Sequence, residues 1–403
     1  MDKDGSIILD PALALKPKTF RVRVSVDNQI TGTSQLSVQS DVKECSIGKS
    51  IQLARDSLFE EELYHEMTLE TRQLLAYGVE LRDSVIHLNA PRLGASSQQL
   101  KLLIDCIPRD EPLADVSAQS HDWLARNVAE ALRLLLAHEH SMRLYRRSQL
   151  PPPLTAQTQE KLPPPLLRTL LAGFRHLEEV DSLYTYLENV SQTLNSAGLN
   201  VVLNTTRELS WAELTENLRK SKQGLSATDQ LFEIFTRPFD GRATVVLPAP
   251  SRAQSETLVL TTRTILAQPI FGTEHKLTLP NSLTADLGLF QTIKFSSVEE
   301  VKSYLDWILS THIAHRIVKA KYPSRAAVNQ NYSRVIILDK GVKTSAPSTS
   351  KEISVKVQAG NLTMKVTIHN APSQENNDAE KSQTWDGDDN SVSLNEWLES
   401  CVK

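Results

Sequence analysis

Residues that could bind phosphate occur early in the chain, but their spacing does not complete a binding loop. The stretch from Ser46 to Ser50 reads SIGKS and resembles the end of a phosphate-binding loop. That loop also needs a glycine five residues before Gly48, so that backbone amides can surround phosphate, and this position is Lys43. We therefore interpret the stretch as the start of a long helix.

Histidines near the middle and towards the end of the chain are the next candidates, because imidazole is a common metal ligand. His138 and His140 are two residues apart, and side chains at that spacing do not face one another on a helix. His312 and His315 could share a face, but His312 falls in an apolar stripe. No nearby cysteine or carboxylate completes a ligand set there. A structural role is the better interpretation of both pairs.

An acidic run close to the C-terminus imitates a calcium-binding loop. Asp386, Asp388 and Asn390 have suitable spacing, but Ser391 stands where the glycine is required and Trp397 where the bidentate glutamate belongs. The sequence also has no Gly-x-Ser-x-Gly elbow and no dinucleotide fingerprint. We therefore predict a protein that is not an enzyme and that has no catalytic residue, metal or cofactor.

Length and composition indicate a globular protein of two or three domains. The chain has 403 residues, of which 40% are hydrophobic and 23% charged. A net charge of -4 does not favour direct nucleic-acid binding, which needs a concentrated basic surface. The three cysteines (Cys45, Cys106 and Cys401) are far apart and are expected to be reduced thiols. No apolar run has the length of a membrane span, so we expect a protein that stays inside the cell.

The element that organises the sequence is an amphipathic helix that is predicted to begin near Ile47 and to stop at Gly78. Two apolar rows run along it at helical spacing, one with Ile47, Ile51, Ala54 and Leu58, the other with Phe59, Leu63, Met67 and Leu74. Between the rows, a side that includes Glu60 and Glu61 is expected to face solvent. Two rows make a wide apolar face, which one neighbouring layer can hardly cover. We expect the row with Leu63 to lie inside the chain.

Short strands and two further helices accompany this helix. Alternation predicts strands over 19–26, 85–88 and 100–107, and a helix from Ser120 to about Arg147. A proline-rich linker follows, and then a helix whose apolar residues from Leu170 to Leu194 step by three or four. Gly198 ends this helix, and a strand over 199–203 follows.

The second half of the chain is rich in predicted strands. They cover 243–247, 257–266, 276–279, 288–295 and 334–338, with a hairpin around Gly360 and Asn361. A short helix is predicted over 211–218, and Ser296 with Glu299 forms a capping box for a helix through Ile317. The polar stretch 373–390 is expected to be disordered, before a short final helix over 394–401.

The predicted fold class is α+β, with long amphipathic helices packed on short antiparallel strands in at least two domains. The first domain covers 1–147 as strand-helix-strand-helix, and the proline-rich linker covers 148–165. A long helix with an α+β domain covers 166–372. An acidic tail with a short terminal helix covers 373–403.

Four stretches, in this order along the chain, resemble one protein family. They are KPKTFRVRVSV from Lys16, followed by Thr31-Gly32-Thr33; ARDSLFEEELYHEMTLETRQLLAYGV from Ala54; LLLAHEHSMRLYRRSQLPPPL from Leu134; and LPPPLLRTLLAGFRHLEEVDSLYTYL from Leu162. Together they are similar to subunit 17 of the Mediator complex, a scaffold of the head module. The likeness covers the first half of the chain well and the second half only through its order of strands. Family members carry a long, mostly helical region before the first strand, so the resemblance implies a C-terminal portion that lacks it.

The resemblance implies a non-enzymatic scaffold subunit of a coactivator in the nucleus. Its expected partners are the other head subunits and RNA polymerase II, with no sequence-specific nucleic-acid binding and no membrane association. A cytoplasmic assembly or tethering subunit is the alternative. The residues expected to meet partners are apolar positions on the two helices: Ile51, Leu58, Leu63, Leu170, Phe174, Leu177, Tyr184 and Leu187.

Overall fold

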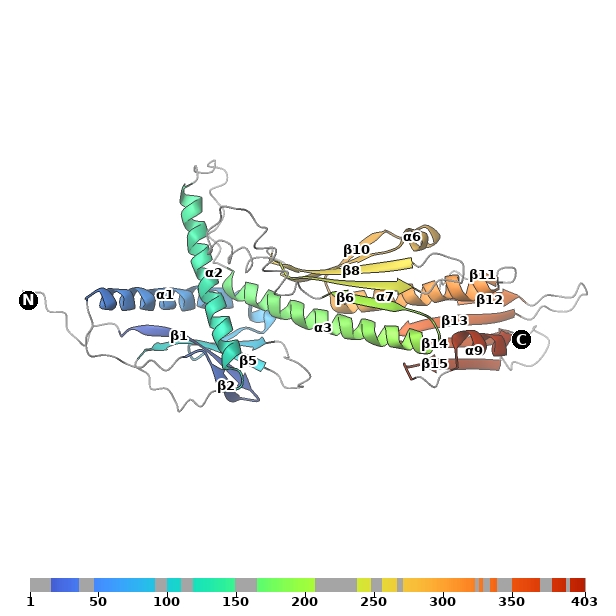
Figure 1. The fold of residues 1–403 in the computed structure, drawn as a ribbon, viewed down its shortest axis with the longest axis horizontal. Coiled ribbons are helices and arrows are strands. Elements are labelled where there is room, and N and C mark those ends of the chain that lie inside the picture. Colours follow the sequence, from blue (N-terminus) through green and yellow to red (C-terminus); the bar gives the residue numbers. More distant parts are fainter. Residues whose placement is uncertain are drawn as a thin grey trace, which may run out of the picture. The chain divides into compact units, whose positions relative to one another are not determined.

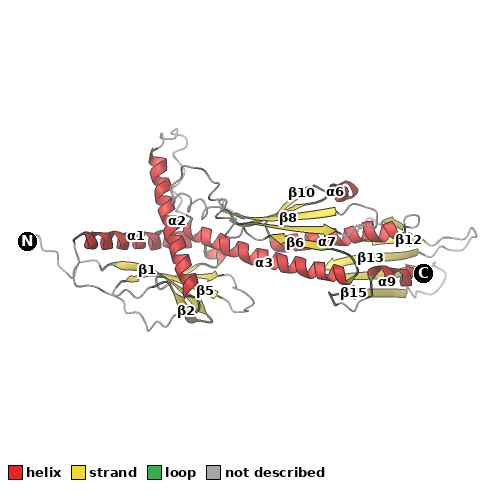
Figure 2. Ribbon diagram, viewed as in Figure 1, coloured by secondary structure: helices red, strands yellow, loops and turns green. Residues whose placement is uncertain are grey.

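The computed structural model describes residues 16–35, 47–90, 100–109, 119–148, 165–206, 238–247, 256–266, 271–322, 326–328, 334–338, 350–369, 379–388 and 392–402. These residues form two compact units. The first unit runs to Arg175 and includes Leu266 and Phe271, and the second contains the other described residues from His176 onward. Each unit combines helices with antiparallel strands, so the predicted α+β class is confirmed (Figures 1 and 2).

The sheet of the first unit has the order β2-β1-β5-β4-β3. Its strands are β1 (Lys18–Val26), β2 (Gln29–Thr33), β3 (Glu80–Arg82), β4 (Val85–Ala90) and β5 (Leu100–Pro108). The alternation seen in the sequence buries Phe20, Val22 and Val24 on one face of β1. Asp27 and Asn28 both have positive φ angles, as the tight turn between β1 and β2 requires.

Three long helices pack in this part of the chain: α1 (Ile47–Thr71), α2 (Asp122–Ser148) and the beginning of α3 (Leu166–Ser196). The helix α1 ends earlier than predicted. It stops at Thr71, and a separate 3-10 turn, η1 (Leu75–Tyr77), leads to Gly78 in the left-handed conformation. The row that contains Leu63 and Met67 is buried together with Leu132 and Leu136 of α2, as expected for an internal row.

The second unit contains two antiparallel sheets. One has the order β10-β9-β8-β7-β6, and the other has the order β11-β12-β13-β14-β15. The strands are β6 (Val202–Thr206), β7 (Asp240–Leu247), β8 (Glu256–Ile265), β9 (Gly272–Thr278), β10 (Thr292–Phe295), β11 (Ala326–Val328), β12 (Arg334–Leu338), β13 (Ser350–Gln358), β14 (Asn361–His369) and β15 (Ala379–Trp385). One continuous core joins both sheets to α3.

The helices of the second unit differ from the prediction in detail. They are the end of α3, then α6 (Asn281–Leu287), α7 (Val298–His312), a π-helical turn η3 (Ile313–Val318), α8 (Lys319–Lys321) and α9 (Leu394–Val402). The strand predicted over 288–295 begins only at Thr292, because Gly288 caps the preceding helix α6 in the left-handed conformation and residues 288–291 form the connection. The cap of α7 is Ser297 rather than Ser296, since its side chain accepts from the Glu299 amide. The helix predicted over 211–218 lies outside the described residues.

The structure also differs from the predicted domain scheme. The two units divide inside α3, between Arg175 and His176, whereas nearly all of the proline-rich linker lies outside the described residues. The segment 373–403 is not a separate tail. Strand β15 pairs with β14 from Leu362↔Trp385 to Ile368↔Ala379, and Trp385, Leu394 and Leu398 are buried. The buried side chains of Trp385, Leu394 and Leu398 pack this segment on the core despite its acidic composition.

No helix in the described ranges is both long and apolar enough to cross a membrane.

Candidate protein-interaction surface

Glu60 joins three elements of the first unit. Its Oε2 accepts a hydrogen bond from the Phe20 amide of β1 at 2.9 Å, on a side of the strand where β2 pairs only from Arg23 onward. The guanidinium of Arg133 on α2 donates to both carboxylate oxygens, at 2.8 and 3.1 Å. The same guanidinium lies over the Phe20 ring. A residue expected on a solvent-facing side of α1 instead fixes α1 to the open edge of β1 and to α2.

Two further glutamates connect α1 with α2. The Nε2 atom of His140 lies 2.8 Å from the carboxylate of Glu62, and Arg143 donates to Glu66 at 3.0 Å. The side chains of His140 and Glu62 are 35% and 40% exposed. A partly exposed ion pair such as that of Arg143 with Glu66 contributes at most about 1 kcal/mol, so these contacts orient the two helices more than they stabilise them.

Glu70 of α1 caps the N-terminus of α3, although the two lie almost one hundred residues apart in the sequence. Its carboxylate accepts from the amides of Leu167 at 2.7 Å and Arg168 at 3.0 Å. The first amides of a helix have no partner within the helix, and a carboxylate there satisfies them. Glu70 is 1% exposed. Burial raises its pKa to about 7, against the opposing effect of the hydrogen bonds from the α3 amides.

The Thr31-Gly32-Thr33 stretch holds the start of α2. The Thr33 amide donates to Asp122 at 2.8 Å, and the His121 amide donates to the Thr31 carbonyl at 3.0 Å. A Cβ atom on Gly32 would lie 2.4 Å from the backbone carbonyl carbon of His121. Only glycine therefore fits where this strand meets the helix.

Three of the eight predicted interface residues are buried in the chain's own core. Leu63, Tyr184 and Leu187 are 0%, 1% and 3% exposed, which leaves them no surface for a partner. They leave the candidate set, because helical periodicity marks an apolar face without showing which layer covers it.

The other five predicted residues keep some exposed surface. Leu170 and Phe174 are half-buried against the core of the first unit, and Leu177 is exposed. Ile51 and Leu58 are 54% and 65% exposed. Of these five, Ile51 and Leu58 belong to one apolar row along α1, together with Ile47.

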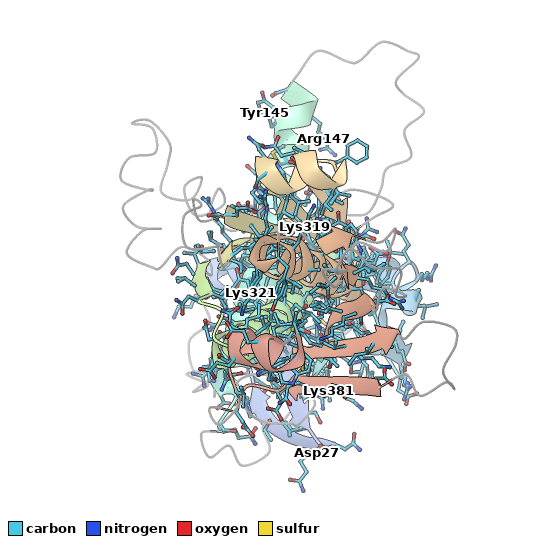
Figure 3. The ribbon with its side chains drawn as sticks, turned by 90° about the vertical axis from the view of Figure 1, so that its right-hand side faces the viewer. Asp27, Tyr145, Arg147, Lys319, Lys321 and Lys381 are labelled. Atoms are coloured by element: carbon cyan, nitrogen blue, oxygen red, sulfur yellow. The ribbon has the colours of Figure 1, made fainter. Side chains whose placement is uncertain are left out.

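Among the described residues of the first unit, Ile47, Ile51 and Leu58 form an exposed row on one side of α1, which we call the α1 apolar row. Ile47 is 81% exposed, and no side chain from Ile47 to Asp56 is buried. A second exposed apolar pair, Leu144 and Tyr145, lies in the last turns of α2, and Figure 3 shows Tyr145 at the outer end of that helix. Apolar side chains that line up on one exposed helix face are typical of surfaces that contact another molecule.

The sequence prediction missed the role of the glutamates. Glu62, Glu66 and Glu70 recur every fourth residue and so share one face of α1, which was a usable signal for a face that contacts other elements. The structure also shows the surroundings of His312, one of the histidines that were expected to bind no metal. His312 is buried and has Glu256 as its neighbour, with 3.7 Å between His312 Nδ1 and Glu256 Oε2. Within the described ranges, no three histidine, cysteine or acidic side chains gather as metal ligands do.

Comparisons with known proteins find one family and several relatives to which the chain is similar. The family described as subunit 17 of the Mediator complex matches residues 1–194. A protein of Aspergillus oryzae named "Mediator of RNA polymerase II transcription subunit 17" is 30% identical over 399 residues, which cover 95% of this chain and 60% of that protein. Proteins of the same name from Coccidioides immitis and Yarrowia lipolytica are 33% identical over 198 residues and 25% identical over 264 residues. These two alignments cover 48% and 64% of this chain, and 28% and 48% of the respective relatives.

The chain thus belongs to the family of Mediator complex subunit 17. The chain spans about 60% of the length of the Aspergillus oryzae relative.

Proposed function

We propose that this chain is a non-enzymatic scaffold subunit of the Mediator coactivator in the nucleus. In this role it supports transcription initiation by RNA polymerase II through protein–protein contacts, and the other head subunits are its immediate partners. The names of its relatives support the assignment of this chain to the Mediator complex. The use of the α1 glutamates to join the chain's own elements supports a structural role.

The α1 apolar row is the observation that carries this proposal. A helical segment of about ten residues is marginal in water on its own, and this one contains Gly48 and Ser50, which favour helix weakly. Its apolar residues are four and seven positions apart, so they line one side of the helix. An amphipathic helix from another subunit would cover this row and supply the packing that the segment lacks within the chain.

The test replaces Ile51 and Leu58 together by serine in the tagged protein expressed in cells. Both side chains are exposed, so we expect the free energy of unfolding to change by no more than about 0.5 kcal/mol per site. Co-purification of head subunits and polymerase should fall strongly. Phe290→Ser is the matched control, because Phe290 is, at 82%, the most exposed large apolar side chain among the described residues of the second unit.

Two results would contradict the proposal. Undiminished recovery of head subunits with the double variant means that the partner surface lies elsewhere. Recovery of a cytoplasmic tethering complex in place of polymerase and head subunits supports the alternative class of scaffold.

A further inference from the structure

Strand β6 is the last strand of its sheet among the residues that the structure describes. It pairs with β7 from Val202↔Val246 to Thr206↔Arg242, and no described strand lies on its other side. Its sequence, VLNTT, has no charged residue and no proline. Such residues normally protect an edge strand from pairing with another chain. The strand at the opposite edge, β10, does carry one, Lys294, which pairs with Glu274.

The core layer next to β6 is incomplete. Leu203 lies opposite Val245 and Thr205 lies opposite Ala243, and both β7 residues are buried. Directly opposed residues of paired strands lie on the same face, so Leu203 and Thr205 belong to the core face of the sheet. Nevertheless, Leu203 is only half-buried and Thr205 is exposed. The sheet has room on its core face at this edge.

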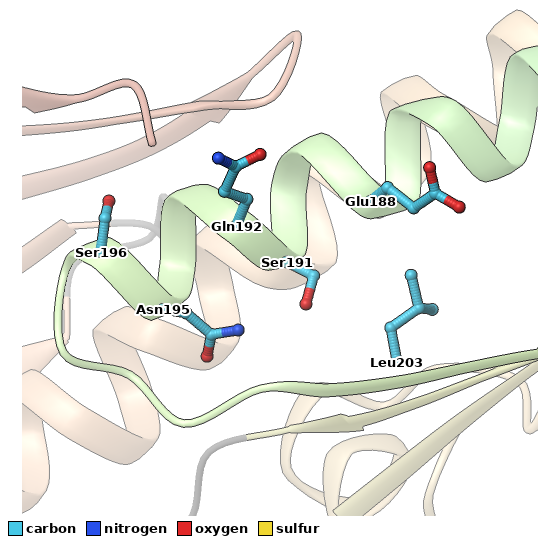
Figure 4. A pocket seen from close by; sticks show the side chains of 6 residues that line it. All are labelled: Glu188, Ser191, Gln192, Asn195, Ser196 and Leu203. Carbon is cyan, nitrogen blue, oxygen red and sulfur yellow. The ribbon is translucent and has the colours of Figure 1, made fainter. Parts of the chain in front are cut away.

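A pocket of about 430 Å³ lies here, lined by Glu188, Ser191, Gln192, Asn195 and Ser196 of α3 and by Leu203 of β6. Figure 4 shows Ser191 and Asn195 pointing from α3 toward β6, and Leu203 pointing back toward Glu188. The Asn195 amide is engaged with the backbone of Val201, through both its oxygen and its nitrogen. Glu188 and Ser191 have no hydrogen-bond or ion-pair partner within the described ranges. The pocket therefore offers one apolar side chain, that of Leu203, a hydroxyl, and a carboxylate that no described residue pairs.

We propose that β6 binds an extended segment of a partner protein as an added strand, and that a lysine or arginine of this segment occupies the pocket. Alternate residues of an added strand point to the core face, so one of them would lie beside Leu203. The methylene groups of a long basic side chain pack on an apolar wall while its charged end reaches a carboxylate, here Glu188. The Tyr184 hydroxyl already donates to the Thr206 carbonyl, so the stretch available for pairing is Val202–Thr205.

This inference is independent of the family of the chain and concerns the second unit alone. Edge pairing supplies the affinity through backbone hydrogen bonds, and the pocket supplies the preference for a basic side chain. The partner is thus defined by an extended uncharged stretch around one lysine or arginine.

The test uses the full chain and a blocked nonapeptide, Ser-Thr-Val-Thr-Lys-Thr-Val-Thr-Ser, with a matched peptide that has glutamate at the centre. We expect the lysine peptide to bind at least about tenfold more tightly, because like charges at a contact disfavour binding. Hydrogen exchange should slow in the complex at those amides of Val202–Thr205 that do not already face β7. Glu188→Lys should reverse the preference between the peptides, whereas Glu178→Lys, an exposed site on the same helix, should leave it unchanged.

A third peptide separates strand addition from simple charge attraction. It keeps the central lysine but has N-methylated backbone amides, which cannot donate to an edge strand. Loss of its binding supports the proposal. Equal binding of this peptide, equal binding of the lysine and glutamate peptides, or slowed exchange only outside β6 would each overturn it.

Discussion

At the scale of single residues, the glutamates of α1 illustrate how one residue type serves different purposes by position. Glu60 satisfies a backbone amide of β1 and a guanidinium, Glu62 and Glu66 orient α2, and Glu70 begins α3. Each contact joins residues that are many positions apart in the chain. A charged run on a helix is usually a solvated face, so the sequence alone did not identify these contacts.

Glu70 leads to a prediction about pH. Its folded pKa of about 7 lies above the ordinary value of 4.5, so between these values the folded chain keeps a proton that the unfolded chain releases. Stability should therefore fall as pH rises through this window, by up to about 3 kcal/mol from this group, and then level off. Glu70→Gln remains neutral, so the difference in unfolding free energy between variant and wild type should move in favour of the variant from pH 5 to 8.

Urea denaturation of both proteins across this pH range measures the effect. A difference that moves the other way would mean that the amides of Leu167 and Arg168 stabilise the carboxylate more than burial disfavours it.

At the scale of elements, the strands and helices of the first unit were largely predictable. The alternation in β1 and the row of Leu63 and Met67 both identify faces that the structure buries. Strand β15 could not be recognised from the sequence, because AEKSQTW is mostly polar. Its last residue, Trp385, is deeply buried. Its place depends on the neighbouring strand β14, which is information that local sequence does not hold.

The two rows of α1 should respond differently to truncation. Leu63→Ala removes fully buried methyl and methylene groups, and we expect a loss of about 2–5 kcal/mol of unfolding free energy. Leu58→Ala, at an exposed position, should change stability by no more than about 0.5 kcal/mol and should weaken the recovery of partners.

Thermal melts and pull-downs of both variants decide the matter. Equal destabilisation by the two substitutions would place the whole face of α1 in the core.

At the scale of the whole molecule, the candidate surface was only partly predictable. Ile51 and Leu58 were identified from helical spacing, while the unpaired edge of β6 and the pocket beside it required the sheet order and the register of β6 with β7. Which residues are left without a neighbour is decided by long-range pairing. Periodicity therefore predicts well which face of an element is apolar, and poorly which apolar residues stay exposed after folding.

The C-terminal elements should be essential for the second unit. Leu394 and Leu398 of α9 are buried in its core, and Lys351 of β13 donates to the last carbonyls of α9, at Cys401 and Val402. A chain shortened to end before Leu394 exposes this core, so we expect losses above about 3 kcal/mol. Hydrogen exchange should speed up in β13 and β14 and stay unchanged in β1 and β5. Unchanged exchange in β13 and β14 would show that α9 contributes little.

The dependence on these last elements has a consequence for the order of events during protein synthesis. The core of the second unit includes Val180 and Leu183 of α3 at one end of its sequence and Trp385 and Leu398 at the other. While the ribosome is still adding the later residues, the apolar faces of β13 and β14 have no α9 to cover them. Nascent chains with such exposed faces are prone to aggregate. We therefore expect nascent chains that already contain β13 and β14 but still lack α9 to bind chaperones more strongly than complete chains.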